Sequence, residues 1–367
     1  MPAIGRFWRR VTDGMELNQL WKQFHADARS SYRLYSHEVD TSRPPETKKG
    51  RHVFNVAAQI FWAVVEKLSP ARRVLLVVAL VLLFVNGGGS FEQGGQRVSW
   101  SFPGAFWGGL LLLALLVLEI ADRVVMKRDL QIAKEIQAWL LPPGPPNVPG
   151  LEIAFATRPA NTVAGDYYDV FARAGSQSYL IAIADVAGKS VPAAMLMATF
   201  QASLKTLAGV AGPLTELAER MNAYACSNSQ NGRRFTTAFL AEYSPASREL
   251  TYVNAGHNAP ILRRRSGAVE RLQRGGVPLG IQELVPYEAG SVTLETGDWL
   301  VIFTDGVTEA ENAWAQEYGE ERLLGMLHGN AGMGPTGLLP AVMADLERFV
   351  GETPQHDDVT LMLLKAV

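Results

Sequence analysis

The sequence contains very little cysteine and histidine. Cys226 is the only cysteine among 367 residues, and there are six histidines. One thiol excludes both an intrachain disulfide framework and a cysteine-ligated zinc cluster. The sequence around Cys226 contains no arrangement of His and Asp that would indicate a nucleophile. We therefore interpret Cys226 as a buried or half-buried thiol.

The chain also lacks a large net charge: its total is −2, but its N-terminal and C-terminal parts carry net charges of opposite sign. Residues 1–73 carry 13 Lys and Arg against 7 Asp and Glu, whereas residues 151–367 carry 16 against 24. An acidic C-terminal half argues against a nucleic-acid substrate, whose phosphates attract Lys and Arg. It suits a site that collects divalent cations. The basic N-terminal part suits a position near anionic lipid headgroups.

Two apolar runs dominate the first half of the chain, at residues 74–85 and 102–118. The second has about the length needed to cross hydrocarbon, while the first is short and is also compatible with a buried core helix. Because the Gly-rich stretch 86–101 separates them, we interpret the pair as a membrane hairpin. Residues 53–68 have helical apolar spacing, which fits either an interfacial amphipathic helix or a packed one.

Basic residues predict the orientation of this hairpin. Its open ends are flanked by Arg72, Arg73, Arg123, Lys127 and Arg128, and the short linker holds only Arg97. The positive-inside bias then places both termini in the cytoplasm. We therefore expect a multi-pass protein of the cell (inner) membrane with its C-terminal domain in the cytoplasm.

A helical connector is predicted over residues 119–141, ending at the proline-rich run 142–146. Val125, Ile132 and Trp139 are spaced by seven, which fits either a short coiled-coil seam in a homodimer or a helix packed on its own domain. The predicted organisation has four parts: a basic cytoplasmic region with the amphipathic helix at 1–70, the hairpin at 71–118, the connector and its boundary at 119–146, and a C-terminal domain at 147–367.

From Leu151 onward, strands and helices alternate. The predicted strands are 151–157, 167–171, 178–185, 235–243, 249–255, 259–264, 298–304 and 358–365. The predicted helices are 190–208, 213–229, 319–328 and 335–350. Strands joined by short turns indicate antiparallel pairing and an α+β fold rather than a Rossmann sheet.

Acidic residues recur where these apolar strands begin or end. The set comprises Asp166, Asp185, Asp305, Asp357 and Asp358. Any single Asp-Gly pair is compatible with an ordinary turn. Converging carboxylates repel one another unless cations neutralise them, and oxygen-only ligands favour Mg²⁺ or Mn²⁺ over zinc.

The sequence resembles PPM-type metal-dependent serine/threonine phosphatases of the SpoIIE/RsbU-like bacterial group. The resemblance covers about residues 130–366 and rests on ordered segments: EIQAWLLPP, VAGDYYDVF, IADVAGKSVPAAMLMA, TTAFLAEYSPASRELTYVNAGHNAPIL, GGVPLGI, GDWLVIFTDGVTEAEN, YGEERL and DDVTLMLL. It implies an α/β/β/α sandwich of two antiparallel sheets flanked by helices, with a binuclear metal site in the cleft.

The resemblance also implies roles for individual residues. Two divalent cations, Mn²⁺ or Mg²⁺, would be bound by Asp166, Asp185, the Val186 carbonyl, Asp305 and Asp357, with Asp358 behind them. A metal-bound water held by Asp185, Asp166 and Asp305 would attack the phosphoester. The family's usual Gly-Gly-Asp is Ala164-Gly165-Asp166 here, and its usual Ser before Gly188 is Ala187. Both are small-for-small changes that should leave the ligands usable.

Two further residues and the partner have open interpretations. His257 fits a general acid or a histidine that fixes a turn, and Lys189 fits a phosphate-attracting or a solvated lysine. The resemblance suggests a phosphorylated STAS-type anti-sigma-factor antagonist as the substrate. The acidic charge of residues 151–367 argues against nucleic acid as a partner. The alternatives are a catalytically inactive phosphatase-like membrane scaffold and a two-metal phosphodiesterase of unrelated fold.

Overall fold

The structure is a computed structural model that describes residues 62, 65–66, 68–93, 96–210, 212–229, 234–330 and 332–367. The chain forms two compact units, residues 1–124 and 125–367. Nearly all of the predicted basic region at 1–70, including its amphipathic helix at 53–68, lies outside the described residues.

The first unit contains helix α4 (Pro70–Phe84), strands β1 (Asn86–Gln93) and β2 (Gln96–Pro103), and the start of helix α5 (Gly104–Leu140). β1 and β2 pair antiparallel, from Asn86 opposite Pro103 to Gln93 opposite Gln96. The interpretation of residues 86–101 as a Gly-rich linker is therefore wrong. The apolar alternation of Val98, Trp100 and Phe102 has the period of a strand, and it was masked by the preceding glycines.

Close backbone packing and ion pairs join α4 to α5. A Cβ on Gly108 would lie 2.7 Å from the Ala79 carbonyl oxygen, so the glycine lets the two helices approach. The Arg72 guanidinium lies 2.7 Å from the Asp122 carboxylate and 3.3 Å from that of Glu119. The two helices thus form a hairpin within this unit.

The second unit holds a six-stranded sheet. Its strands are listed in chain order: β4 (Tyr167–Ala172), β5 (Tyr179–Val186), β6 (Thr236–Ser244), β7 (Glu249–Ala255), β10 (Gly275–Gly276) and β11 (Gly290–Thr293). β4 to β7 are antiparallel neighbours in sequence order, as short turns require. β11 pairs antiparallel with β7, and only the two-residue β10 runs parallel to it.

A five-stranded antiparallel sheet faces it. In spatial order its strands are β3 (Leu151–Arg158), β13 (Val359–Ala366), β12 (Trp299–Phe303), β8 (Ile261–Arg263) and β9 (Val269–Arg271). β13 pairs with β3 over its whole length, from Val359 opposite Arg158 to Ala366 opposite Leu151. The last strand of the chain therefore lies beside the first strand of the domain.

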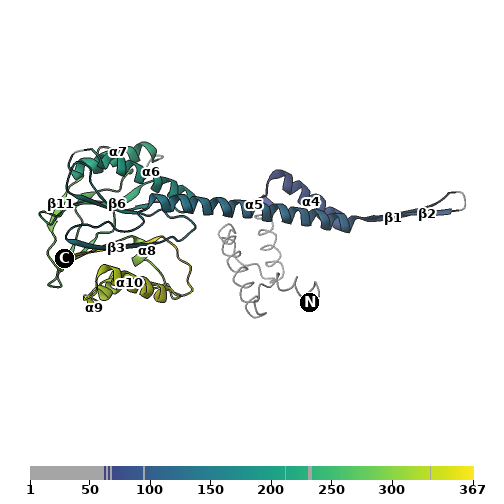
Figure 1. The fold of residues 1–367 in the computed structure, drawn as a ribbon. Coiled ribbons are helices and arrows are strands. Elements are labelled where there is room, and N and C mark those ends of the chain that lie inside the picture. The colour runs from purple at the N-terminus through teal and green to yellow at the C-terminus, as the bar shows by residue number, and fades with distance from the viewer. Residues whose placement is uncertain are drawn as a thin grey trace, which may run out of the picture. The chain divides into compact units, whose positions relative to one another are not determined.

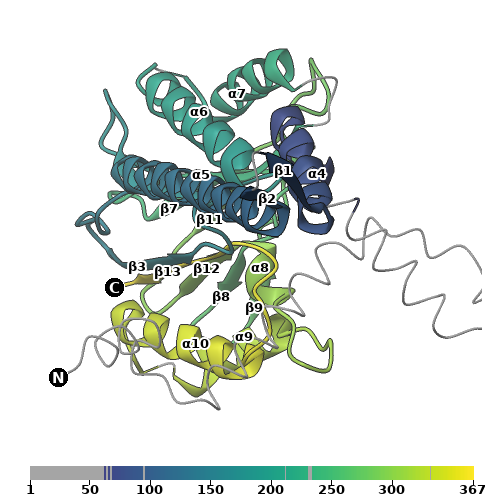
Figure 2. The same ribbon diagram turned by 90° about the vertical axis from the view of Figure 1, so that its right-hand side faces the viewer.

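Helices cover the outer face of each sheet (Figures 1 and 2). α6 (Ser190–Ala208) and α7 (Leu214–Asn228) pack on the six-stranded sheet, and α9 (Gly319–Gly329) and α10 (Pro335–Val350) pack on the other. A third apolar cluster fills the space between the sheets, with Ile181, Phe239 and Met362 fully buried. The prediction of two antiparallel sheets flanked by helices is confirmed.

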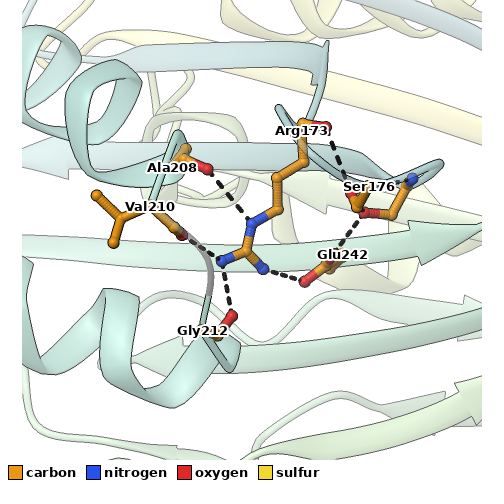
Figure 3. A network of polar contacts seen from close by, with 7 residues as sticks. Arg173, Ser176, Ala208, Val210, Gly212 and Glu242 are labelled. Atoms are coloured by element: carbon orange, nitrogen blue, oxygen red, sulfur yellow. Dashed lines mark hydrogen bonds and ion pairs between the residues drawn. The ribbon is translucent and has the colours of Figure 1, made fainter.

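A buried arginine fixes the connection between α6 and α7 (Figure 3). Arg173 follows β4, and its guanidinium donates to the carbonyl oxygens of Ala208 (3.4 Å), Val210 (3.4 Å) and Gly212 (2.7 Å). It also pairs with Glu242 of β6, which accepts from Ser178. Only 6% of the Arg173 side chain is exposed, so this network holds the end of α6 against the sheet.

Candidate metal and phosphate site

The predicted ligands come from both sheets. Asp166 directly precedes β4 and Asp185 lies near the end of β5 in the six-stranded sheet. Asp305 begins the short helix α8 (Asp305–Thr308) after β12, and Asp357 lies two residues before β13 in the other sheet. Because Tyr167 pairs with Ala184 and Phe303 with Leu361, each sheet places two carboxylates at one end.

The charges of these carboxylates act on one another across the two sheets. Burial first, and then the charges of Asp305, Asp357 and Asp358, raise the pKa of Asp185 to about 7. Burial and the Asp185 charge raise the pKa of Asp166 well above its usual range. Burial and Asp357 raise that of Asp305. Carboxyl groups from four chain segments therefore share one electrostatic environment.

Two threonines position Asp166, which is almost fully buried. One Asp166 carboxylate oxygen accepts hydrogen bonds from the Thr304 hydroxyl (3.0 Å) and the Thr360 hydroxyl (2.6 Å). The Thr304 hydroxyl oxygen in turn accepts from the Thr360 backbone N–H at 3.0 Å. The sequence reasoning missed both threonines. Their only signal is a Thr within two residues of an Asp where an apolar strand ends or begins.

Asp358 orders the loop that precedes Asp166. One of its oxygens accepts from the Ala160 N–H at 2.7 Å and the other from the Gly165 N–H at 2.6 Å. A Cβ on Gly165 would lie 3.2 Å from the Val186 carbonyl oxygen, so this loop brings Asp166 close to Val186. In this structure both Asp358 oxygens are used to hold backbone.

Lys189 lies against Asp357. Its ammonium is 3.2 Å from the Asp357 carboxylate and donates to the His356 carbonyl oxygen at 2.6 Å. Lys189 also lowers the pKa of Asp305, although burial and Asp357 raise it more strongly. The lysine therefore pairs with a predicted ligand, although 55% of its side chain is exposed.

His257 lies just after β7 and is buried. Its Nδ1 is 3.0 Å from the Thr237 hydroxyl, and its backbone N–H donates to the Asn254 side-chain oxygen at 2.7 Å. Burial lowers the pKa of His257 to about 4, so the ring is neutral at pH 7. These contacts favour the turn-fixing interpretation over the general acid.

The donor set fits a divalent cation in its chemistry. All predicted side-chain ligands are carboxylates, which hard cations such as Mg²⁺ and Mn²⁺ prefer. Within the described ranges, no three Asp, Glu, His or Cys side chains form an assembled metal-binding group. Burial and then the charges of neighbouring carboxylates raise the pKa values of Asp185 and Asp305, and a bound cation would offset both effects.

The fold and the site define the class of this protein. This four-layer sandwich is shared with the SiaA-PP2C domain of Pseudomonas aeruginosa, with a TM-score of 0.57 and 23% sequence identity over 67% of this chain and 99% of that one. The model of the SpoIIE family (stage II sporulation protein E) matches residues 175–367. The chain belongs to this family, and its C-terminal domain is of the PP2C-type serine/threonine phosphatase class, consistent with a metal-dependent protein phosphatase.

Curated relatives agree with this assignment. The chain is 29% identical to phosphoserine phosphatase RsbU of Bacillus subtilis over 243 residues, which cover 65% of this chain and 70% of that protein. It is 27% identical to protein IcfG of Synechocystis sp. over 274 residues, which cover 68% of this chain. The match spans 43% of the length of IcfG.

Proposed function

We propose that this protein is a membrane-anchored phosphatase that hydrolyses phosphoserine or phosphothreonine of a partner protein. The observation that carries the proposal is the group of carboxylates at the strand ends of both sheets, whose charges raise one another's pKa values. Structural ion pairs can also perturb pKa values, but here four segments converge without an equal number of cations.

The residues divide into distinct tasks. Asp166, Asp185, Asp305, Asp357 and the Val186 carbonyl would hold two divalent cations, Mn²⁺ or Mg²⁺. When bound, such ions stabilise phosphoryl charge and activate water. Thr304 and Thr360 orient Asp166. Lys189 supplies positive charge beside Asp357, where a phosphate group would approach.

The substrate and cellular setting extend this proposal. RsbU is a phosphoserine phosphatase by name, and we propose a phosphorylated STAS-type regulator as the corresponding substrate here. Among the described helices, α5 alone is long and apolar enough to cross a membrane. Both α4 and α5 expose apolar side chains, including Val77, Val81 and Leu113, which supports a hairpin in lipid. The basic residues at the open ends of the hairpin support a catalytic domain in the cytoplasm.

The test is metal-dependent hydrolysis by the purified chain. Release of phosphate from phosphoserine STAS proteins and from p-nitrophenyl phosphate is expected with Mn²⁺ or Mg²⁺ and should be lost with EDTA. Asp185→Asn and Asp305→Asn should each reduce turnover by a factor of about 100 or more, because each removes a ligand charge. Circular dichroism should show that both variants remain folded, since losing a carboxylate relieves repulsion.

Chelator-insensitive hydrolysis, or full activity in either variant, would exclude the proposed site. A folded wild type that hydrolyses neither substrate with either metal would favour the inactive scaffold.

A further inference from the structure

A cavity of about 240 Å³ adjoins the predicted ligands. It lies beside Asp357 and reaches from the end of β3 to the segment between α8 and α9. Its positive lining comes from Arg158 and Lys189. The Arg158 Nε donates to the Gln355 side-chain oxygen at 2.7 Å, and no described carboxylate forms an ion pair with Arg158. This end of the cavity suits a phosphate group.

The same cavity also has a negative lining. Glu309, Glu311 and Glu317 contribute to it, and none of them forms an ion pair with any other residue in the described ranges. Partial burial, then the charges of Asp305 and Glu317, raise the pKa of Glu309. Three carboxylates beside a phosphate-binding centre would repel an acidic substrate and attract a basic one.

The segment that carries these glutamates is well braced. The Asn312 side-chain oxygen accepts from the backbone N–H groups of Trp314 (2.9 Å) and Gln316 (3.1 Å). Glu311 and Glu317 form an antiparallel bridge, and the Tyr318 N–H donates to the Ala310 carbonyl oxygen at 2.9 Å. The loop therefore has a defined shape before any partner binds.

Trp314 lies at the tip of this braced loop and is 80% exposed. A tryptophan held in one position loses little conformational freedom on binding and can bury a large apolar area. Such residues are frequent energetic centres of protein interfaces. Here Glu311 and Glu317, which line the cavity, flank the exposed ring in sequence.

We propose that residues 309–317 form the docking surface for the phosphoprotein and select substrates with a Lys or Arg close to the phosphoserine. The phosphate enters beside Arg158 and Lys189, the basic side chain meets Glu311 and Glu317, and Trp314 packs on an apolar side chain of the partner. This inference rests on the proposed phosphatase activity and adds the chemistry of the substrate.

The experiment compares two phosphoserine peptides that differ only by Arg or Glu at the positions beside the phosphoserine. The full chain in detergent with Mn²⁺ is expected to favour the Arg peptide roughly tenfold in kcat/KM, mainly through KM, since each of two partly exposed ion pairs strengthens binding by about threefold. Glu311→Gln combined with Glu317→Gln should reduce this preference to about twofold. Trp314→Ala should raise KM for a phosphorylated STAS protein several-fold.

The matched control is Glu283→Gln combined with Glu288→Gln, which removes two exposed charges outside the cavity and should keep the tenfold preference. Circular dichroism checks that each variant is folded. Equal kcat/KM for the two peptides in the wild type, with p-nitrophenyl phosphate still hydrolysed, would overturn this inference and leave the phosphatase proposal intact. Metal-independent or absent hydrolysis of all substrates would overturn both.

Discussion

At the scale of single residues, the predicted ligands are held with different firmness. Asp166 is buried and accepts from two threonine hydroxyls, whereas Asp357 is partly exposed and pairs with a long, flexible lysine. Side-chain entropy favours movement at the Lys189–Asp357 pair rather than at Asp166. A cation entering the site would therefore find Asp166 already oriented and would compete with Lys189 for Asp357.

Gly306 also limits what can change near the site. A Cβ there would lie 2.0 Å from the Asp358 carbonyl oxygen, so this position tolerates no side chain without a backbone shift. The glycine lets the turn after β12 touch the segment before β13. Two predicted ligands, Asp305 and Asp357, are brought together by this contact.

His257 gives a pH prediction. Its pKa is lowered to about 4 in the folded chain from about 6.5 in the unfolded one, so the unfolded state binds the proton first as pH falls. The stability contributed by the neutral ring is complete above pH 6.5 and is lost as pH falls toward 4. We expect the free energy of unfolding to drop by roughly 3 kcal/mol over this range from His257 alone.

Urea unfolding of wild type and His257→Gln at pH 7.0, 5.5 and 4.5 measures this contribution. The variant should be less stable at pH 7.0 and should show a smaller loss on acidification. Parallel pH curves for the two proteins would contradict the assignment of a neutral, buried ring.

The site residues were only partly predictable. The five aspartates stood out because each interrupts an apolar strand pattern at the strand's end. Thr304 and Thr360 did not, because threonine is common in strands and its hydroxyl partner lies far away in sequence. The pairing of Lys189 with Asp357 depends on a contact across 168 positions, which local patterns do not contain.

At the scale of elements, the Arg173 network joins three parts of the six-stranded layer (Figure 3). Replacing Arg173 with Leu leaves Glu242 and the carbonyls of the α6–α7 connection without their donor. Removing one member of a buried pair costs about 3–5 kcal/mol, and the partial exposure of Glu242 places the expected loss near 2–4 kcal/mol. Amide hydrogen exchange should accelerate near residues 208–214.

Arg220→Leu is the matched control, because Arg220 pairs with Glu216 on the exposed face of α7. Its cost should stay below about 0.5 kcal/mol. Equal losses of stability in the two variants would show that the Arg173 network does not hold the α6–α7 connection. Unchanged amide hydrogen exchange near α6 in Arg173→Leu would show the same.

Strong periodicity made most elements of the catalytic domain predictable. The predicted helices 190–208 and 335–350 and the predicted strand 249–255 match α6, α10 and β7, and the other predicted elements differ at their ends by one or a few residues. β9, β10, β11 and α8 were missed because they span two to four residues, too few for a periodic pattern. β1 and β2 were missed because glycines were interpreted as a linker.

At the scale of the whole molecule, the apolar segments give a topology prediction. A reporter that is active only in the cytoplasm should work when fused after Val367 and should fail when inserted within residues 87–100. The basic residues at the open ends of the hairpin are the physical reason. Activity at both positions would show that residues 74–85 do not cross the membrane, and the reverse pattern would refute the hairpin.

The helix α5 gives a prediction about assembly. Val125, Ile132 and Trp139 are all exposed in this single chain, and Trp139 is 82% exposed. We propose that they face the same residues of a second copy. Replacing Ile132 and Trp139 with Glu should lower the mass in detergent to that of a monomer and change phosphoprotein turnover more than metal affinity.

Light scattering, calorimetric titration with Mn²⁺ and turnover assays test this on one preparation. Lys134→Glu, which changes charge elsewhere on the helix, is the control. If the wild type is monomeric, or if the double variant at Ile132 and Trp139 has unchanged turnover, α5 only connects the two units and does not control activity through a dimer.

The boundary between the two units falls inside α5, at residues 124 and 125, with no break in the helix. Near its end, the Gln137 side chain donates to the Ala164 carbonyl oxygen and accepts from the Ala164 N–H, two residues before Asp166. Each residue added to an α-helix turns everything beyond it by about 100°. One residue inserted in α5 would therefore turn the two parts of this helix by about 100° relative to each other about the helix axis, whereas seven would nearly restore the original angle. Inserting or deleting residues in α5 therefore changes the rotation about the axis of this helix as well as its length.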